Sequence, residues 1–184
     1  MKTVGIAGSG GLGSNCAVAL ARVGIGKLII ADFDTIDETN LNRQYFFYDQ
    51  IGQKKVVALC DNIKKINPDT IVECHDVKLD PDKILELYSE CNVIVEAFDL
   101  AEAKQMIIET VLEKLPRIPL VTGNGLAGWG LNNLIKTQKI DDFYICGDQY
   151  FEVSDDLPPL APRVGIVANM QANQVLEILL GEPL

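Results

Sequence analysis

A run of closely spaced glycines near the start of the chain is suited to holding a phosphate group. The segment reads GSGGLG at residues 8–13, follows an apolar run and precedes a segment of helical periodicity. Glycine permits turns with positive φ and lets a ligand approach the backbone, and the free N–H groups of a helix N-terminus attract an anion. We therefore expect four glycines to form a nucleotide-binding turn: Gly8, Gly10, Gly11 and Gly13.

An acidic residue, Asp32, ends the second apolar run at the distance typical of dinucleotide sites, about 20 positions past the glycines. We expect its carboxylate to accept hydrogen bonds from ribose hydroxyls. These two features alone also suit a nicotinamide-dependent oxidoreductase. Against that alternative stand the long loop over residues 33–50 and the absence of a plausible hydride-site His or Tyr-Lys pair.

Polar and basic residues follow in that long loop and just after it. Asn40 and Arg43 lie in the loop, and Lys54 and Lys55 fall in the first turn of a helix expected over residues 52–66. The helix dipole disfavours cations at that end, so their placement indicates an approaching polyphosphate. We expect Arg43 and Lys55 to bind it, and Lys54 to be a solvated surface charge.

Asp99 is the first charge after the strand expected at 92–98, whose apolar run 93–98 is interrupted by Glu96. Ligands of open parallel sheets bind beyond the carboxyl ends of the strands, where Asp99 is expected to lie. Asp before Leu100 also suits a helix N-cap. The two roles are compatible, and both stay open from the sequence.

The fold expected from the periodicity is α/β. Apolar runs alternate with helical segments, which predicts a doubly wound, mostly parallel, Rossmann-like sheet with an antiparallel C-terminal extension. Strands are expected at 3–8, 27–32, 70–77, 92–98 and 118–122, with an antiparallel pair at about 131–137 and 142–146. Helices are expected at 11–24, 52–66, 81–90, 101–115 and 163–181.

Composition restricts the possible partners. The 184 residues predict one domain spanning 1–184, and 16 basic against 26 acidic residues give a net charge of −10, which argues against nucleic acid. The sequence contains no apolar run near 18 residues and no signal-peptide pattern, so we expect a cytoplasmic protein without a membrane segment. The five cysteines include no CxxC pair, so no zinc site is expected.

Several motifs together resemble the ThiF/MoeB branch of the ubiquitin-activating-enzyme-like adenylyltransferases. The resemblance covers almost the whole chain and is carried by GSGGLG at 8–13, DFDTID at 32–37, TNLNRQ at 39–44, GQKK at 52–55, INP at 66–68, Asp99 and APRVGIVANMQANQVLEILLG at 161–181. The segment GNGLAGWG at 123–130 looks most like the short ThiF-like variety of thiamine biosynthesis.

The resemblance implies an activity with ATP and Mg²⁺ as cofactors. The C-terminal Gly-Gly carboxylate of a ubiquitin-like sulfur carrier, ThiS-like in the thiamine thiazole pathway, would attack the α-phosphate and release pyrophosphate. By motif position, Asn40, Arg43 and Lys55 would contact phosphates, Asp32 would hold ribose and Asp99 would coordinate Mg²⁺. Arg43, Lys55 and Asp99 would thus be the catalytic residues. The resemblance also implies a homodimer.

The chain departs from this family at three points. It lacks the two zinc-binding CxxC pairs of many relatives, has Leu100 where longer relatives often have Asn, and starts at the first strand without preceding helices. A non-catalytic carrier-binding module therefore remains an alternative. A molybdopterin-type carrier is a separate alternative for the enzyme. Cys146 is a candidate for a covalent link to the carrier, although a buried structural role is the simpler expectation. Trp129 is a candidate for covering the nucleotide or gripping a Gly-Gly tail, although packing is the simpler expectation.

Overall fold

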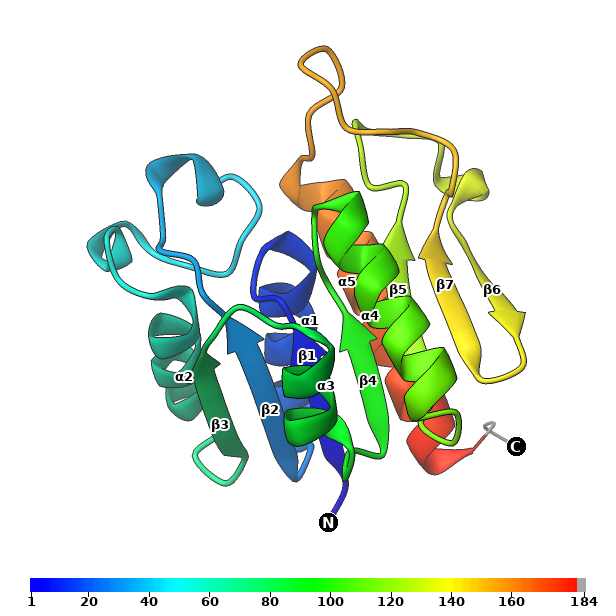
Figure 1. Cartoon of the computed structure of the whole chain (residues 1–184). Coiled ribbons are helices and arrows are strands. Elements are labelled where there is room, and N and C mark those ends of the chain that lie inside the picture. Colours follow the sequence, from blue (N-terminus) through cyan, green and yellow to red (C-terminus); the bar gives the residue numbers. More distant parts are fainter. Residues whose placement is uncertain (182–184) are drawn as a thin grey trace.

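Apolar strands and amphipathic helices alternate along the chain, and the computed structural model, which describes residues 1–181, arranges them as a sheet between two helical layers (Figure 1). The strands are β1 (Thr3–Ala7), β2 (Lys27–Asp32), β3 (Ile71–Asp76), β4 (Val93–Glu96), β5 (Leu120–Asn124), β6 (Lys136–Ile140) and β7 (Phe143–Gly147). The α-helices are α1 (Gly11–Arg22), α2 (Lys55–Ile66), α3 (Pro81–Tyr88), α4 (Ala101–Lys114) and α5 (Ala161–Leu180). Short 3₁₀ helices are η1 (Glu38–Asn40), η2 (Tyr48–Gln50) and η3 (Asn132–Leu134).

The sheet has the strand order β3-β2-β1-β4-β5-β7-β6. Every neighbouring pair is parallel except β6 and β7, which are antiparallel. The chain moves outward from β1 to β3 and then returns to the other side of β1 at β4. Ligands of such sheets bind in the crevice at this reversal point. The predicted doubly wound sheet with an antiparallel end is confirmed.

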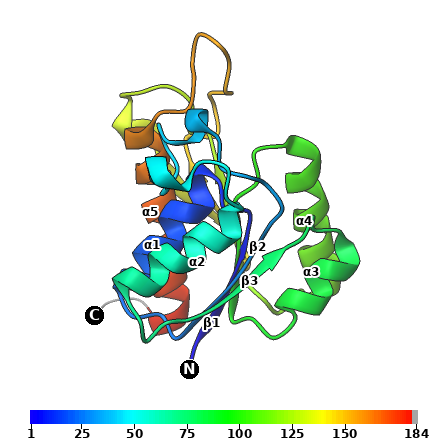
Figure 2. The same cartoon turned by 90° about the vertical axis from the view of Figure 1, so that its left-hand side faces the viewer.

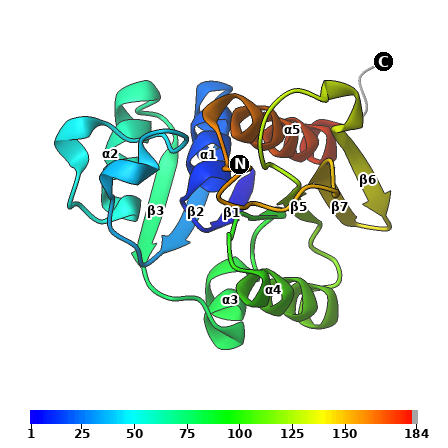
Figure 3. The same cartoon turned by 90° about the horizontal axis from the view of Figure 1, so that it is seen from above.

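Helices cover both faces of the sheet, as the view from above shows (Figure 3). The side view places α1, α2 and α5 on one face, and α3 and α4 on the other (Figure 2). Strands β1, β2 and β4 are rich in Val and Ile and are buried along nearly their whole length, as expected for parallel strands covered on both sides. Each face packs its own apolar cluster against its helices.

Helix α2 begins later than the sequence predicts. The backbone of Lys54 is extended, with φ −63° and ψ 131°, so helical geometry starts at Lys55 rather than at residue 52. The preceding residues instead bond to the loop after β2, where Ile36 N–H donates to the Gln53 carbonyl at 2.9 Å and Gly52 N–H donates to the Ile36 carbonyl at 2.9 Å. The expectation that both lysines lie inside the first helical turn is therefore wrong for Lys54.

The last helix begins earlier than predicted, at Ala161 instead of residue 163. Pro162 lies in its first turn, where a missing N–H costs no helical hydrogen bond. The apolar stripe of this helix packs into the core of the chain itself, with Val164, Val167 and Val175 fully buried. None of the helices within residues 1–181 combines the length and the apolar character that crossing a bilayer requires.

Candidate functional site

The glycine turn connects β1 to α1 at the reversal point of the sheet. Gly8 has φ +96°, and a Cβ at this position would lie 2.8 Å from the Ala97 carbonyl oxygen after β4. A Cβ on Gly13 would collide with the carbonyl oxygen of Gly8, so close packing within the turn requires glycine there. Among residues 1–181, no side chain caps the start of α1, and its first turn contains no acidic residue. This helix end is suited to an anion.

Asp32 lies at the end of β2, beside the glycine turn, and is 9% exposed. Its Oδ2 accepts hydrogen bonds from the Ser9 N–H at 2.6 Å and the Ser9 hydroxyl at 2.9 Å. Its Oδ1 accepts one bond, from the Asp34 N–H at 2.7 Å. A carboxylate oxygen can accept two hydrogen bonds, so Oδ1 keeps an acceptor position suited to a hydroxyl donor such as ribose.

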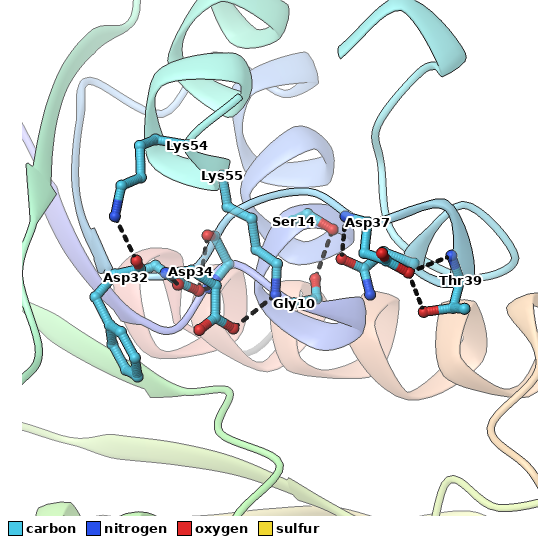
Figure 4. Close-up of polar contacts among 11 residues, drawn as sticks. Gly10, Ser14, Asp32, Asp34, Asp37, Thr39, Lys54 and Lys55 are labelled. Atoms are coloured by element: carbon cyan, nitrogen blue, oxygen red, sulfur yellow. Dashed lines mark hydrogen bonds and ion pairs between the residues drawn. The ribbon is translucent and has the colours of Figure 1, made fainter. Parts of the chain in front are cut away.

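The two lysines before and at the start of α2 point to different partners (Figure 4). Lys55, whose side chain is 8% exposed, places Nζ 2.8 Å from Oδ2 of Asp34, two residues past Asp32. Lys54 is more exposed and donates to the Phe33 carbonyl at 2.7 Å, with Asp76 at 3.0 Å. Lys55 therefore lies beside Asp34 at the candidate site. Lys54 lies at the surface but is not simply solvated, because it connects the loop after β2 to Asp76 of β3.

Arg43 lies against the first turn of α1. A Cβ built on Gly11 would lie 3.6 Å and 3.7 Å from its Cγ and Cδ. The Asn15 amide holds the two segments together by donating to the Gly11 carbonyl at 2.7 Å and the Arg43 carbonyl at 2.8 Å. The Arg43 Nη1 atom donates to the Thr39 carbonyl at 3.1 Å and to Asn42 Oδ1 at 2.7 Å. The guanidinium keeps further N–H donors for an anion at this helix end.

Asn40 has a local structural task in the same loop. Its Oδ1 accepts the Asp37 N–H at 3.1 Å, while Asp37 Oδ1 accepts the Thr39 N–H at 2.9 Å, so the two side chains close a capping box around η1. Figure 4 shows Asp37 and Thr39 joined in this way. These bonds from Thr39 lower the pKa of the Asp37 carboxyl. Only the Asn40 amide N–H₂ is left to contact a phosphate.

Asp99 follows β4 and is exposed. The N-cap of α4 is Leu100, and no side chain of the described residues caps that helix, so the N-cap role considered for Asp99 is wrong. Within residues 1–181, no hydrogen bond or ion pair engages the Asp99 carboxylate or joins it to Arg43 or Lys55. Its strand end still adjoins the glycine turn, because the Ala97 N–H donates to the Ala7 carbonyl at 2.9 Å.

The chemistry of Asp99 fits a Mg²⁺ ion that arrives with a phosphate ligand. Mg²⁺ sites of this kind use one or two carboxylates together with substrate phosphates and water. In the described part of the chain no cation pairs with this exposed carboxylate, which is the type of protein ligand that such a site uses. Across the described part of the chain, no cluster of three or more His, Cys, Asp or Glu side chains is arranged to hold a metal ion.

The structure supports the buried role expected for Cys146 and corrects the role expected for Trp129. Cys146 is fully buried in β7, 3.6 Å from the Thr137 hydroxyl, and burial raises the pKa of its thiol. A thiolate is the nucleophilic form, so this position does not support a covalent link to a carrier. Trp129 is 67% exposed, so the packing role expected for it is wrong and its ring is free to contact a ligand or partner.

Two buried ion pairs near the carboxyl edge were not predicted from the sequence. Glu96 pairs with Lys104, and Asp148 pairs with Arg163. For the pair of Glu96 and Lys104, the one indication in the sequence was a carboxylate inside an apolar strand. Neither partner was identifiable, because each pair depends on how the helix after the strand packs back on the sheet: Lys104 lies in α4, which follows β4, and Arg163 lies in α5, which follows β7.

Comparison with known proteins gives the chain a family context. The sequence profile of the ThiF family matches residues 1–184. "Adenylyltransferase and sulfurtransferase MOCS3" of Caenorhabditis briggsae is 31% identical over 180 residues, which cover 94% of this chain and 44% of that protein. The molybdopterin-synthase adenylyltransferase of Escherichia coli K12 is 27% identical over 181 residues, which cover 96% of this chain and 72% of that protein. The chain thus spans less than half of the first relative.

Solved structures share the fold. E. coli tRNA N6-threonylcarbamoyladenosine dehydratase TcdA, in complex with AMP, superposes with a TM-score of 0.85 at 22% identity, covering 97% of this chain and 86% of that one. E. coli MccB with ATP gives a TM-score of 0.72 at 22% identity, covering 97% of this chain and 55% of that one. At these identities the likeness is one of fold, and it agrees with the Rossmann-like sheet described above.

Proposed function

The chain belongs to the ThiF family, and we propose that it is an adenylyltransferase that uses MgATP to activate the C-terminal Gly-Gly carboxylate of a ubiquitin-like sulfur carrier protein. One observation carries this proposal. An uncapped helix N-terminus, an acidic residue with a free acceptor position and two basic side chains, Arg43 and Lys55, occupy one edge of the sheet. The relatives named as adenylyltransferases support the same reaction class.

In the proposed reaction, the protein positions two reactants and neutralises charge. The glycine turn binds the phosphates, Asp32 Oδ1 accepts a ribose hydroxyl, and Arg43 and Lys55 offset the phosphate charge. An oxygen of the carrier's carboxylate attacks the α-phosphorus, the bond from that phosphorus to the bridging oxygen breaks, and pyrophosphate leaves. The product is an acyl adenylate. Asp99 would hold Mg²⁺, which would supply further positive charge to offset that of the phosphates.

No side-chain nucleophile is needed, because the carrier supplies the attacking oxygen. Positioning and electrostatic stabilisation supply most of the catalysis in phosphoryl-group chemistry. Asp34 keeps the Lys55 ammonium in place before ATP binds. Because the Asp34 carboxylate is partly exposed, a phosphate that reaches the site can replace it as the ion-pair partner of Lys55. The arrangement thus provides a cation that a triphosphate recruits on binding.

The finer assignment is a carrier of thiamine thiazole synthesis, supported by the resemblance of residues 123–130 to the short ThiF-like variety. A carrier of molybdopterin synthesis is the second candidate, favoured by the name of the E. coli relative.

We also propose that the protein forms a homodimer and is located in the cytoplasm. A groove of about 860 Å³ between α1 and α5 exposes the apolar side chains of Val23 and Ile166, which a second copy of the chain would cover. Sedimentation velocity tests whether two copies associate.

An exchange assay between labelled pyrophosphate and ATP tests the proposed function. Exchange is expected with MgATP and a carrier that ends in Gly-Gly, and not with the same carrier lacking those glycines. Running a thiamine-type and a molybdopterin-type carrier in parallel identifies the pathway. Absence of exchange with both would contradict the enzyme assignment, and ATP binding without exchange would favour the non-catalytic module. Tight binding of NADH would favour the oxidoreductase.

Replacing each lysine in turn separates the site from the surface. Lys55→Met is expected to weaken MgATP binding about tenfold or more, because a hydrogen bond from a charged group contributes about 1.5–3 kcal/mol. Lys54→Met is the matched control, and we expect its dissociation constant to stay within about twofold of the wild type because its partners lie at the surface. Isothermal titration calorimetry measures both. Equal losses in the two variants would place the phosphates elsewhere.

A further inference from the structure

A buried carboxylate lies at the end of β4, three residues before Asp99. The Glu96 side chain is 0% exposed. Its Oε1 accepts the Phe98 N–H at 2.7 Å, and its Oε2 accepts the Lys104 ammonium at 2.5 Å and the Thr122 hydroxyl. Burying a carboxylate is costly unless it is paired and hydrogen-bonded, and these donors satisfy it. The carboxylate therefore fixes the backbone turn that follows β4.

Lys104 extends this connection to the next strand. It lies in α4 and, besides Glu96, donates to the Gly123 carbonyl at 2.9 Å. Gly123 lies in β5, at the start of the segment over residues 123–130 that carries the exposed Trp129. One ammonium thus joins the end of β4, the helix α4 and the end of β5.

The two loops held by this pair belong to the proposed site. Asp99 is adjacent to Phe98, and its own side chain makes no bond within residues 1–181. Its position is therefore set by the backbone turn, which Glu96 holds through the Phe98 N–H. Segment 123–130 begins at the carboxyl end of β5, the strand next to β4, and so leaves the sheet at the same edge as the Asp99 turn.

We propose that Glu96 and Lys104 are positioning residues for the adenylylation reaction, holding the Asp99 turn and the start of segment 123–130 in one fixed relation. The inference rests on the proposed function. Neither residue contacts substrate in this scheme. Glu96 acts through the Phe98 amide, and Lys104 acts through Glu96 and the Gly123 carbonyl. Loss of the pair lets Asp99 leave the place where it holds Mg²⁺.

The main test variant is Lys104→Met, which removes the ammonium and keeps most of the side-chain volume. We expect kcat for carrier-dependent exchange to fall about tenfold to a hundredfold, since misplacing a catalytic group by about 1 Å costs up to about a hundredfold. The Mg²⁺ concentration for half-maximal rate is expected to rise. ATP binding without Mg²⁺ is expected to stay within about twofold of the wild type, because Asp32 and the glycine turn are untouched.

Two further variants separate positioning from general stability. Lys104→Arg keeps a cation in reach of Glu96, and its larger guanidinium can extend toward solvent because the Lys104 side chain is 22% exposed. We expect this variant to retain most of the wild-type kcat and the wild-type Mg²⁺ dependence. Lys83→Met is the matched control, because it breaks an exposed lysine–carboxylate pair of 2.6 Å with Glu86 on α3. We expect wild-type kinetics from it. Wild-type kcat and Mg²⁺ dependence in folded Lys104→Met would overturn the proposal.

Hydrogen exchange gives a readout that does not require activity. In Lys104→Met, amides of residues 97–100 and 123–126 are expected to exchange about tenfold faster, while those of β1 and β2 keep their protection. If the wild-type protein does not catalyse exchange between pyrophosphate and ATP, the proposed function fails. If amide protection in Lys104→Met equals that of the wild type, the positioning role is overturned, whatever the outcome of the pyrophosphate assay. Should Lys104→Met not fold, Glu96→Gln/Lys104→Met removes both charges and is expected to show the same local loss of protection.

Discussion

Asp99→Ala is expected to lower the rate of carrier-dependent pyrophosphate exchange by about a hundredfold to a thousandfold, the range seen when one transition-state-stabilising group is removed. The exposed carboxylate makes no bond within residues 1–181, so the free energy of unfolding is expected to stay within about 0.5 kcal/mol of the wild type. The exchange assay and urea unfolding measure the two effects.

Glu102→Ala is the matched control for Asp99→Ala. Glu102 is an exposed acidic residue in the first turn of α4, close in sequence to Asp99. Its removal changes the net charge equally and leaves the turn after β4 intact, so we expect exchange within about twofold of the wild type. If Asp99→Ala retained more than half of the wild-type rate, Asp99 would not hold the metal.

Arg163→Leu is expected to lower the free energy of unfolding by about 3–5 kcal/mol, because it leaves the fully buried Asp148 carboxylate without its cation. Arg163 Nη2 pairs with Asp148 Oδ2, and Nη1 donates to the Gly130 carbonyl at 2.5 Å. Asp148 also accepts the Tyr150 N–H at 2.7 Å. The pair therefore joins the start of α5 to the segments on either side of β6 and β7.

Urea unfolding at neutral pH measures this loss. Arg117→Leu, which removes an exposed arginine at the loop before β5, is the control and is expected to cost less than about 0.5 kcal/mol. The double variant Asp148→Asn/Arg163→Leu is expected to be less destabilised than Arg163→Leu, since no buried charge is left unpaired. A loss below about 1 kcal/mol in Arg163→Leu would show that Asp148 finds other compensation.

The fold was predictable because its signals are local. Alternating apolar runs and helical segments specify a doubly wound sheet, and the glycines at 8–13 mark the reversal point. The start of α2 was misplaced because Gly52 and Gln53 bond to Ile36, a contact that local periodicity does not encode. The parallel pairing of β7 with β5 likewise depends on where the hairpin packs and not on its own sequence.

The site divides in the same way. The glycine turn and Asp32 lie where the sequence predicts, because each follows directly from the end of a strand. The bond between Lys55 and Asp34 and the pairing of Glu96 with Lys104 required the structure, since each depends on a neighbour brought in by tertiary packing. An isolated carboxylate in an apolar strand signals that a cation is nearby, but not which one.

The most direct test of the central claim is a crystal structure of the protein with Mg²⁺ and a non-hydrolysable ATP analogue. The account predicts phosphates at the start of α1, a ribose hydroxyl on Asp32, Lys55 turned from Asp34 to a phosphate, Arg43 on the same triphosphate, and the metal on Asp99. An analogue bound elsewhere, or Arg43, Lys55 and Asp99 all out of reach of its phosphates, would contradict it.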